Sequence, residues 1–201
     1  CFVRTCDLNP VDIKIFLKMK ITSMAIPEVL LLEPVVHKDD RGYFMETFRK
    51  SLFDERGLHM DFVQDNQSMS KKGALRGLHY QLEHPQGKLA RVLSGQVFDV
   101  AVDLRKESPS FTHWVGEVLS AENRKQLWIP PGFAHGFLVL SDTAELSYKC
   151  TDYFHPEDEH SLLWRDPEVH IKWPEIDGKI TLSEKDQAAK MLPEAPVFEF
   201  I

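Results

Sequence analysis

The chain has few cysteines, no long apolar stretch and no excess of positive charge. Its three cysteines, Cys1, Cys6 and Cys150, show neither a disulfide framework nor the spacing of a zinc motif. This pattern indicates a reducing compartment, and we expect a cytoplasmic protein. No apolar run reaches the roughly 20 residues that a membrane-spanning helix needs. The net charge of -7 argues against sequence-independent binding of nucleic acid, which requires a positive surface.

The length and composition are those of one ordinary globular domain. The chain has 201 residues, of which 43% are hydrophobic and 27% charged. Residues 1–23 lack the apolar centre of a secretory signal and match nothing that follows. We expect them to be an N-terminal extension of uncertain origin, and residues 24–201 to form a single domain.

From Ile26 onward, short strand-like segments alternate with turn residues. The clearest is Gln96–Arg105, in which Phe98, Val100, Val102 and Leu104 fall on one face and Val97, Asp99, Ala101 and Asp103 on the other. Further strands are predicted at Glu28–Val36, Tyr43–Phe48, Leu89–Leu93, Trp114–Leu119, Gln126–Ile129, Gly136–Leu140 and Glu145–Thr151, with a hairpin turn at Ser94-Gly95. Ser51 and Ser183 are expected to begin short helices, the first ending at Gly57. The pattern predicts an all-β sandwich or barrel with a few short helices.

The segment Leu75–Gln81 carries the first candidate for chemistry. On a strand, His79 shares a face with Gly77 and Gln81, whereas Arg76 is expected on the opposite face. An imidazole, with an unperturbed pKa of about 6.5, can accept a proton near neutrality. The pattern fits a buried core histidine equally well.

Three other residues have both a chemical and a purely structural interpretation. Lys88 can supply a cation beside His79, or it can be a solvated lysine. Tyr148 is predicted on the same strand face as Leu146 and Cys150, where its hydroxyl needs a partner or a substrate. Asp186 either polarises a histidine or only caps the helix that begins at Ser183.

The segment Leu127–Phe137 contains Pro-x-Gly-x-x-His, ending at His135, a pattern common in the second half of cupin barrels. There the histidine often binds a metal together with a His-x-His pair in the first half. Here the first half offers His79 followed by Tyr80 and Gln81, and His84 lies too far along. The sequence therefore does not support a three-ligand metal site, and we expect no metal and no cofactor.

Taken together, these segments resemble the dTDP-4-dehydrorhamnose 3,5-epimerase family of cupin-type jelly rolls. The resemblance spans about residues 26–186, in the family's order. Its most specific motifs are LRGLHYQ, IPPGFAHGF and LSEKD; the other matching segments are Asp40–Glu46, Phe62–Asn66, Gln86–Lys88, Val97–Arg105, Leu119–Asn123, Tyr148–Thr151 and Trp164–Pro167. It implies a double-stranded β-helix, the cupin jelly-roll barrel.

The resemblance also implies a reaction and the residues for it. The reaction is inversion of C3 and C5 of dTDP-4-dehydro-6-deoxy-D-glucose in dTDP-L-rhamnose biosynthesis. His79 matches the general base, Asp186 its partner, Tyr148 the general acid and Lys88 the cation beside the C4 oxygen. Positions that match substrate contacts are Gln64, Asp65, Asn66, Arg76, His135, Glu159 and Lys185. Arg41 and Glu46 match contacts delivered from the partner subunit of a homodimer that exchanges N-terminal strands.

One position departs from the family's pattern. A second tyrosine is usual three residues after the Thr of the YKxT segment, but here that position is Phe154, with Tyr153 beside it. The departure keeps open a related enzyme that inverts one carbon only or moves the keto group between C3 and C4. A metal-dependent cupin and a non-catalytic sugar-binding jelly roll are two further interpretations of the same motifs.

Overall fold

The computed structural model describes residues 19–199, so residues 1–18 of the expected extension lie outside it. The strands are β1 (Lys20–Ser23), β2 (Leu30–Glu33), β3 (Val36–Asp39), β4 (Gly42–Met45), β5 (Gln64–Lys71), β6 (Leu75–Gln81), β7 (Lys88–Ser94), β8 (Gln96–Asp103), β9 (Trp114–Ser120), β10 (Gln126–Ile129), β11 (Phe133–Val139), β12 (Thr143–Cys150) and β13 (Glu159–Ser161). The helices are α2 (Lys50–Asp54) and α3 (Glu184–Gln187), with 3-10 turns at Pro156–Asp158 and Leu192–Glu194. None of the helices in this described part has the length and apolar character that a membrane crossing requires.

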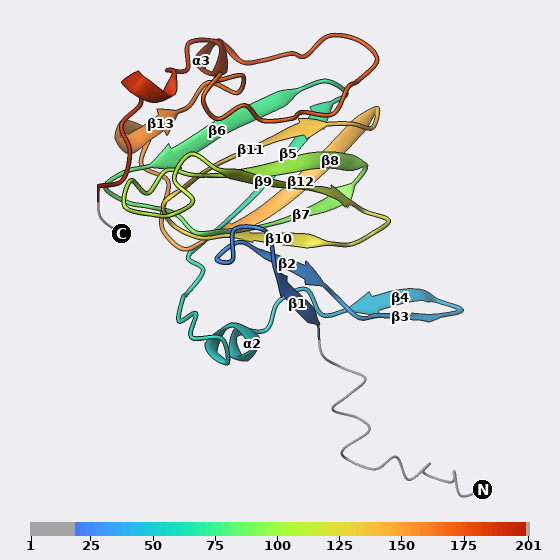
Figure 1. The fold of residues 1–201 in the computed structure, drawn as a ribbon. Helices are drawn as coiled ribbons and strands as arrows, with labels where there is room; N and C mark the ends of the chain where they lie inside the picture. Colours follow the sequence, from blue (N-terminus) through green and yellow to red (C-terminus); the bar gives the residue numbers. More distant parts are fainter. Residues whose placement is uncertain (1–18, 200–201) are drawn as a thin grey trace, which may run out of the picture.

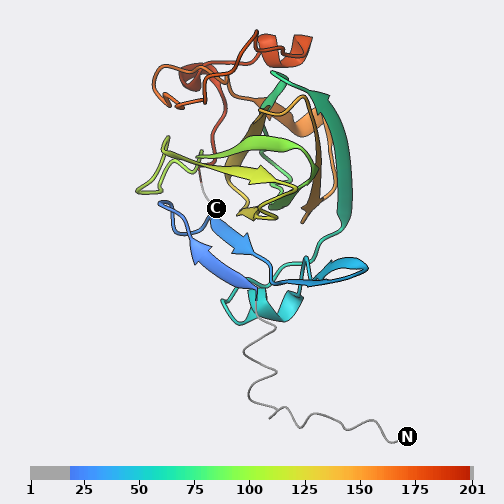
Figure 2. The same ribbon diagram turned by 90° about the vertical axis from the view of Figure 1, so that its right-hand side faces the viewer.

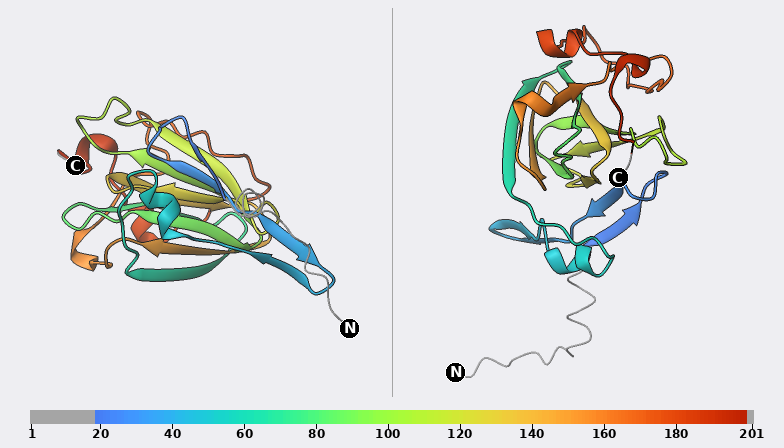
Figure 3. Two further views of the ribbon diagram at one scale, coloured as in Figure 1. Left: turned by 90° about the horizontal axis from the view of Figure 1, so that it is seen from below. Right: turned by 90° about the vertical axis from the view of Figure 1, so that its left-hand side faces the viewer.

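Two sheets enclose one interior, as Figure 2 shows nearly end-on. The six-stranded sheet has the order β1-β2-β10-β7-β12-β5, and the five-stranded sheet the order β13-β6-β11-β8-β9. Strands β3 and β4 form a separate hairpin, which projects away from the barrel (Figures 1 and 3). The predicted all-β jelly-roll barrel, a double-stranded β-helix with a few short helices, is confirmed.

Strand β8 shows how the alternating pattern builds two cores at once. Val97 and Ala101 point into the cluster between the two sheets. Val100 and Leu104, one residue out of phase, join a second cluster on the outer side of the five-stranded sheet, together with Phe198 near the C-terminus. Both faces of β8 are therefore buried, which fits a strand in which apolar residues dominate both faces.

Short helical and irregular segments cover the outside of each sheet. The C-terminal segment crosses the outer face of the five-stranded sheet (Figure 1), where Leu192 and Phe198 are buried. Helix α2 lies at the outer side of the six-stranded sheet, where Leu52 and Phe53 pack in one cluster with Trp128. Part of each outer face is thus buried, and a polar cavity opens between the sheets.

Several strand boundaries differ from the sequence prediction, which also did not include β5 and β13. The single strand expected at Glu28–Val36 is divided into β2 and β3. Pro34 lies between them and has no N–H to donate, so strand pairing stops there. The apolar stretch Tyr43–Phe48 is a strand only in its first part. Upstream of Met24, β1 pairs with β2 in antiparallel register, so the last residues of the segment 1–23 belong to the sheet.

The helix ends were predicted partly. Ser183 caps α3 as expected, since its hydroxyl accepts a hydrogen bond from the Asp186 amide at 3.1 Å. Ser51 lies inside α2 and does not cap it; the N-cap position is Arg49, which makes no side-chain cap bond. Gly57 follows the helix with a φ of 74°. The amide of Leu58 donates a hydrogen bond to the Phe53 carbonyl at 3.0 Å, as in a Schellman motif.

A β-bulge in β6 changes which residues face the interior. His135 pairs with His79, but Phe137 pairs with Arg76, so three steps along β6 oppose two along β11. The extra residue lies next to Gly77, which has a φ of 112°. Because a bulge inverts the alternation of side chains, Arg76 and His79 end on the same face. The expectation that Arg76 points opposite to His79 was wrong for this reason.

Gly77→Ala is expected to lower the free energy of unfolding by about 1–3 kcal/mol more than Gly178→Ala does. A Cβ at Gly77 would lie 2.6 Å from both the Gly136 Cα and the His135 carbonyl oxygen, whereas one at Gly178 meets nothing within 4 Å. The two glycines have nearly equal positive φ angles, 112° and 113°, so the control isolates the collision. Urea denaturation measures both, and equal losses would show that β6 accommodates the methyl group.

Candidate active site

A cavity of about 310 Å³ opens between the two sheets. Its walls come from both: β5, β7 and β12 on one side, and β6, β11 and β13 on the other. The lining residues are Gln64, Asn66, Ser68, Arg76, His79, Gln86, Lys88, His135, Gly136, Phe137, Tyr148, Phe154, Glu159 and Lys185. Most of the residues singled out in the sequence therefore meet at one place.

The imidazole of His79 contacts a buried carboxylate. Its Nε2 lies 2.5 Å from Asp186 Oδ1, a contact between residues 107 positions apart. The imidazole is partly exposed to the cavity, whereas the Asp186 carboxylate is almost fully buried. With Nε2 engaged by Asp186, Nδ1 is the ring nitrogen left for a ligand.

Asp186 both belongs to the cap of helix α3 and contacts a histidine, the two roles that the sequence left open. Its amide is capped by Ser183, and its second carboxylate oxygen accepts a hydrogen bond from the Ser183 hydroxyl at 2.8 Å. Burial by itself raises the pKa of Asp186, but the hydrogen bond and the charge of His79, together with Ser183, outweigh it and lower the pKa. The carboxylate stays ionised and orients the imidazole, the function of the aspartate in a Ser-His-Asp triad.

Lys88 brings an unsatisfied cation to the cavity. Its side chain is buried, and no residue of the described part of the chain makes a hydrogen bond or ion pair with its Nζ. Burial lowers the pKa of Lys88, and the negative charges of Glu159 and Asp99 offset this only in part. An ammonium in such a place stabilises an oxygen on which negative charge develops.

Tyr148 lies on the opposite sheet from His79, on β12. Its ring centroid is 6.4 Å from that of His135, the cross-strand partner of His79. Burial raises the pKa of the Tyr148 phenol above its ordinary value, which keeps the hydroxyl protonated. Leu146 and Cys150 are buried on the same strand, in agreement with the predicted face. The structure thus places an imidazole and a neutral phenol on facing walls of one cavity.

The rest of the wall is polar. Arg76 is anchored by a hydrogen bond from its Nε to the Ser70 hydroxyl at 2.9 Å, and Gln64 donates to the Asn66 side chain at 3.0 Å. Lys185 and Glu159 form an ion pair of 2.7 Å at the same cavity. Fixed donors and acceptors of this kind suit a ligand with several oxygens.

Three expected site residues lie elsewhere. Asp65 points outward and binds Lys149 at 2.9 Å, because on β5 it alternates with the lining residues Gln64 and Asn66. Arg41, at the tip of the projecting hairpin, pairs with Asp39 at 2.6 Å. Glu46, which follows the same hairpin, pairs with Arg49 at 2.6 Å. None of the three lines the cavity of its own chain.

Sequence reasoning missed a second histidine–carboxylate pair. His135 Nε2 lies 2.9 Å from Asp99 Oδ1, and both side chains are buried. Asp99 was placed correctly on the face of β8 that carries Val97 and Ala101, but it was not singled out. The available signal was an acidic residue on an inward face of a buried strand, which needs a partner.

The barrel and its cavity define a cupin-type β-barrel enzyme built for acid–base chemistry. The sequence profile of the dTDP-4-dehydrorhamnose 3,5-epimerase family matches residues 23–194. The chain belongs to this family and is an isomerase. The resemblance inferred from the motifs is thereby confirmed.

Individual relatives are similar over nearly their whole length. The dTDP-4-dehydrorhamnose 3,5-epimerase of Pseudomonas aeruginosa is 55% identical over 181 residues, covering 90% of this chain and 99% of the relative. The crystal structure of dTDP-6-deoxy-D-glucose-3,5-epimerase from Legionella pneumophila, in complex with dTDP-4-keto-L-rhamnose, has a TM-score of 0.88 and 49% identity and covers 92% and 100% of the two chains. ChmJ, a 3'-monoepimerase from Streptomyces bikiniensis in complex with dTDP-quinovose, has a TM-score of 0.79 and 35% identity, covering 86% and 87%.

Proposed function

We propose that the chain inverts C3 and C5 of dTDP-4-dehydro-6-deoxy-D-glucose, a step of dTDP-L-rhamnose biosynthesis, without metal or cofactor. The observation that carries the proposal is the placement of His79 and Tyr148 on facing sheets at one cavity. The names of the Pseudomonas and Legionella relatives support the substrate class.

The substrate needs a base and an acid on opposite sides of its ring. The hydrogens at C3 and C5 are both α to the C4 ketone. His79 removes one of them, the C–H electron pair forms a C=C bond, and the C4 oxygen becomes an enolate. Tyr148 then donates its phenolic proton to the same carbon from the other face, which inverts the centre. As the carbon takes this proton, the C4 ketone re-forms. Before the second inversion the imidazolium gives up its proton and the phenolate takes one up, either by direct transfer between them or through solvent.

Proton transfer by positioned side chains contributes about 10²- to 10⁴-fold, which is too little for a carbon acid. We assign the remainder largely to stabilisation of the enolate oxygen by Lys88, whose cation is buried and has no hydrogen-bond partner in the described part of the chain. Asp186 orients His79 and stabilises its protonated form. The sugar and its diphosphate are held by the remaining polar lining, to which Arg76, His135, Gln64 and Asn66, Glu159 and Lys185 belong.

Incubation with the substrate in deuterated buffer tests this function. Each carbon that exchanges takes up deuterium, so proton NMR of the product should show label at C3 and at C5, and activity should persist in a chelator. Label at one carbon only would replace the proposal with a single inversion, as in the 3'-monoepimerase ChmJ. Phe154, which lines the cavity where a tyrosine is usual in the family, is the observation that favours this second candidate. Migration of the keto group to C3 would indicate a ketoisomerase.

The alkaline limb of the kcat/KM profile is expected to follow Lys88. Burial lowers the pKa of Lys88 and raises the pKa of Tyr148. Loss of the Lys88 charge as the pH rises is therefore expected to produce an alkaline limb of kcat/KM at a pH lower than 10.5, the ordinary lysine pKa. Lys88→Arg should move this limb to higher pH while lowering the plateau. An unchanged limb in that variant would mean that another group sets it.

The site is also proposed to be completed by a second copy of the chain. Arg41 and Glu46 lie on or next to the projecting β3–β4 hairpin, whose Tyr43 and Phe44 are exposed by 57% and 70% (Figure 1). We infer a homodimer with exchanged N-terminal strands, in which these two residues reach the partner's cavity. Mixing the variants Arg41→Ala and His79→Ala tests this, because a hybrid dimer regains one complete site. Recovery of activity on mixing is expected, and no recovery in a proven hybrid would contradict the exchange.

A cytoplasmic location belongs to the same proposal. It is supported by the low cysteine content, and Cys150, within residues 19–199, is a buried free thiol. Fractionation of cells that produce the protein, with the enzyme activity as the marker, tests it.

A further inference from the structure

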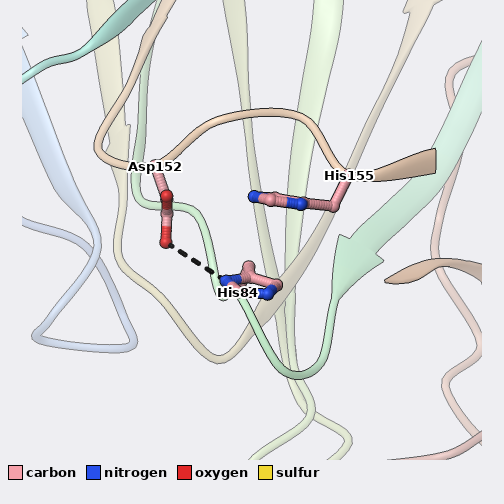
Figure 4. A group of neighbouring side chains, drawn as sticks. All are labelled: His84, Asp152 and His155. Carbon is pink, nitrogen blue, oxygen red and sulfur yellow. Dashed lines mark ion pairs between the residues drawn. The ribbon is translucent and has the colours of Figure 1, made fainter. Parts of the chain in front are cut away.

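Two loops meet beside the active-site cavity and bring three metal-ligating side chains together. His84 lies on the loop between β6 and β7, and Asp152 and His155 lie on the loop after β12 (Figure 4). One ligand atom from each residue lies within 4.8 Å of the other two. None of the three lines the cavity or has a part in the proposed reaction.

The two imidazoles are stacked, with ring centroids 3.9 Å apart and an interplanar angle of 15°. Figure 4 shows a nitrogen of each ring on the side of Asp152. His84 Nδ1 is 4.0 Å from Asp152 Oδ2. Each ring thus presents a nitrogen to the same carboxylate, and imidazole nitrogens are the commonest protein ligands of transition metals.

The backbone under this cluster is fixed by buried side chains. Gln81, which is 3% exposed, donates its Nε2 to the His84 carbonyl at 2.7 Å and accepts the His155 amide at 2.8 Å. Gln86 donates to the Asp152 carbonyl at 2.9 Å. The two loops are therefore positioned relative to each other before any ion binds, which lowers the cost of ordering a site.

Acidic side chains behind the cluster support it further. Glu157 Oε1 lies 3.5 Å from His155 Nδ1, which favours the tautomer with the proton on Nδ1 and leaves Nε2 free for a metal. The buried Asp158 carboxylate accepts the amides of Glu83 and His84 at 2.8–3.0 Å and thereby rigidifies the turn that carries His84. A carboxylate behind a ligating histidine is the usual outer-shell arrangement of metal sites.

We propose that His84, Asp152 and His155 bind one divalent transition cation of the zinc class. Two imidazoles and one carboxylate are a borderline donor set that suits zinc, whereas calcium and magnesium prefer oxygen ligands alone. Bonds of about 2.1 Å place tetrahedral donors roughly 3.4 Å apart, so donor atoms that now lie up to 4.8 Å apart have to approach one another and the two stacked rings have to tilt until their nitrogens point at one ion. Side-chain rotation supplies this movement, because the three side chains are 48%, 39% and 30% exposed. Water completes the coordination.

The ion would act on the wall of the active site and take no part in the proton transfers. Phe154, between Asp152 and His155 in the chain, lines the cavity, as does Gln86 on the other loop. A cation that joins the two loops stiffens this wall. Zinc is therefore expected to raise the melting temperature and to change KM more than kcat.

The test uses the whole 201-residue chain with Cys1→Ser and Cys6→Ser, since cysteine side chains can bind zinc by themselves. After chelator treatment and dialysis, Zn²⁺ is titrated calorimetrically, and Co²⁺ serves as the spectroscopic probe. One ion per chain is expected, with the affinity lowered about tenfold or more by His84→Ala, His155→Ala or Asp152→Asn. His113→Ala, at an exposed position outside the cluster, is the matched control and should bind as the parent does.

Absence of one-to-one binding in the parent, or binding that survives the double variant His84→Ala/His155→Ala, would overturn the site. Folding of each variant is checked by its epimerase activity without added metal, which the proposal leaves within a fewfold of the parent. Asp152→Asn preserves shape, so it keeps the test decisive if a histidine variant does not fold. Loss of zinc binding with retained activity would support the site.

Discussion

Replacing His79 by alanine is expected to lower kcat by about 10²- to 10⁴-fold, the contribution of a well-placed general base. The Asp186 carboxylate, 2.5 Å from the imidazole, is almost fully buried and remains ionised, so it aligns the ring and stabilises its protonated form. Removing the ring leaves no other base in that position, because the second histidine at the cavity, His135, is engaged by its own carboxylate. Steady-state kinetics with the dTDP-linked ketose measures the loss.

The matched control is His113→Ala, which removes an exposed imidazole that is not among the cavity-lining residues. It should keep kcat within a fewfold of the parent. Both variants should bind dTDP, because the nucleotide is held by other groups. Near-normal turnover in His79→Ala, with a melting curve like that of the parent, would remove His79 from the role of base.

Tyr148→Phe is expected to separate two events that the parent enzyme couples. Proton abstraction by His79 needs only the base and the cation of Lys88, so deuterium uptake from solvent should continue within about tenfold of the parent rate. Return of the proton from the opposite face needs the phenol, so formation of the inverted product should fall by about 10²- to 10⁴-fold. Proton NMR in deuterated buffer reads both rates in one experiment.

Tyr153→Phe serves as the control for this variant, because Tyr153 is 58% exposed and is not among the residues that line the cavity. Its removal should change neither rate appreciably. If exchange and inversion disappear together in Tyr148→Phe, then Tyr148 does more than donate a proton, and the assignment of acid and base to facing walls is wrong.

Local pattern was sufficient for most of the fold. The alternation in Gln96–Arg105 predicted both faces of β8, and the turn at Ser94-Gly95 marked its hairpin with β7. These features depend on neighbours only a few residues apart, which the sequence displays directly. Errors arose where one residue overrode the pattern, as Pro34 did by dividing an apolar run into β2 and β3.

The candidate site was predicted by motif and not by geometry. From spacing alone, Asp186 fitted a helix cap and a histidine partner equally well, and only the resemblance to a family favoured the second. The structure shows both, since the capping bond uses the amide and the Ser183 hydroxyl while the free carboxylate oxygen reaches His79. Asp99 carries a usable signal, an acid on an inward strand face, but it belongs to none of the motifs from which the site was predicted.

The sequence by itself determined most of the strands, the caps at Gly57 and Ser183, the all-β class and the family, because these follow from local periodicity and from contiguous motifs. Only the tertiary structure decided that Arg76 faces the cavity, that Asp65 does not, and that His84 meets Asp152 and His155. These placements depend on strand register, on a bulge and on loops that lie far apart in the chain. Sheet pairing is nonlocal, and a shift of one residue moves a side chain to the other face, so no local pattern could specify them.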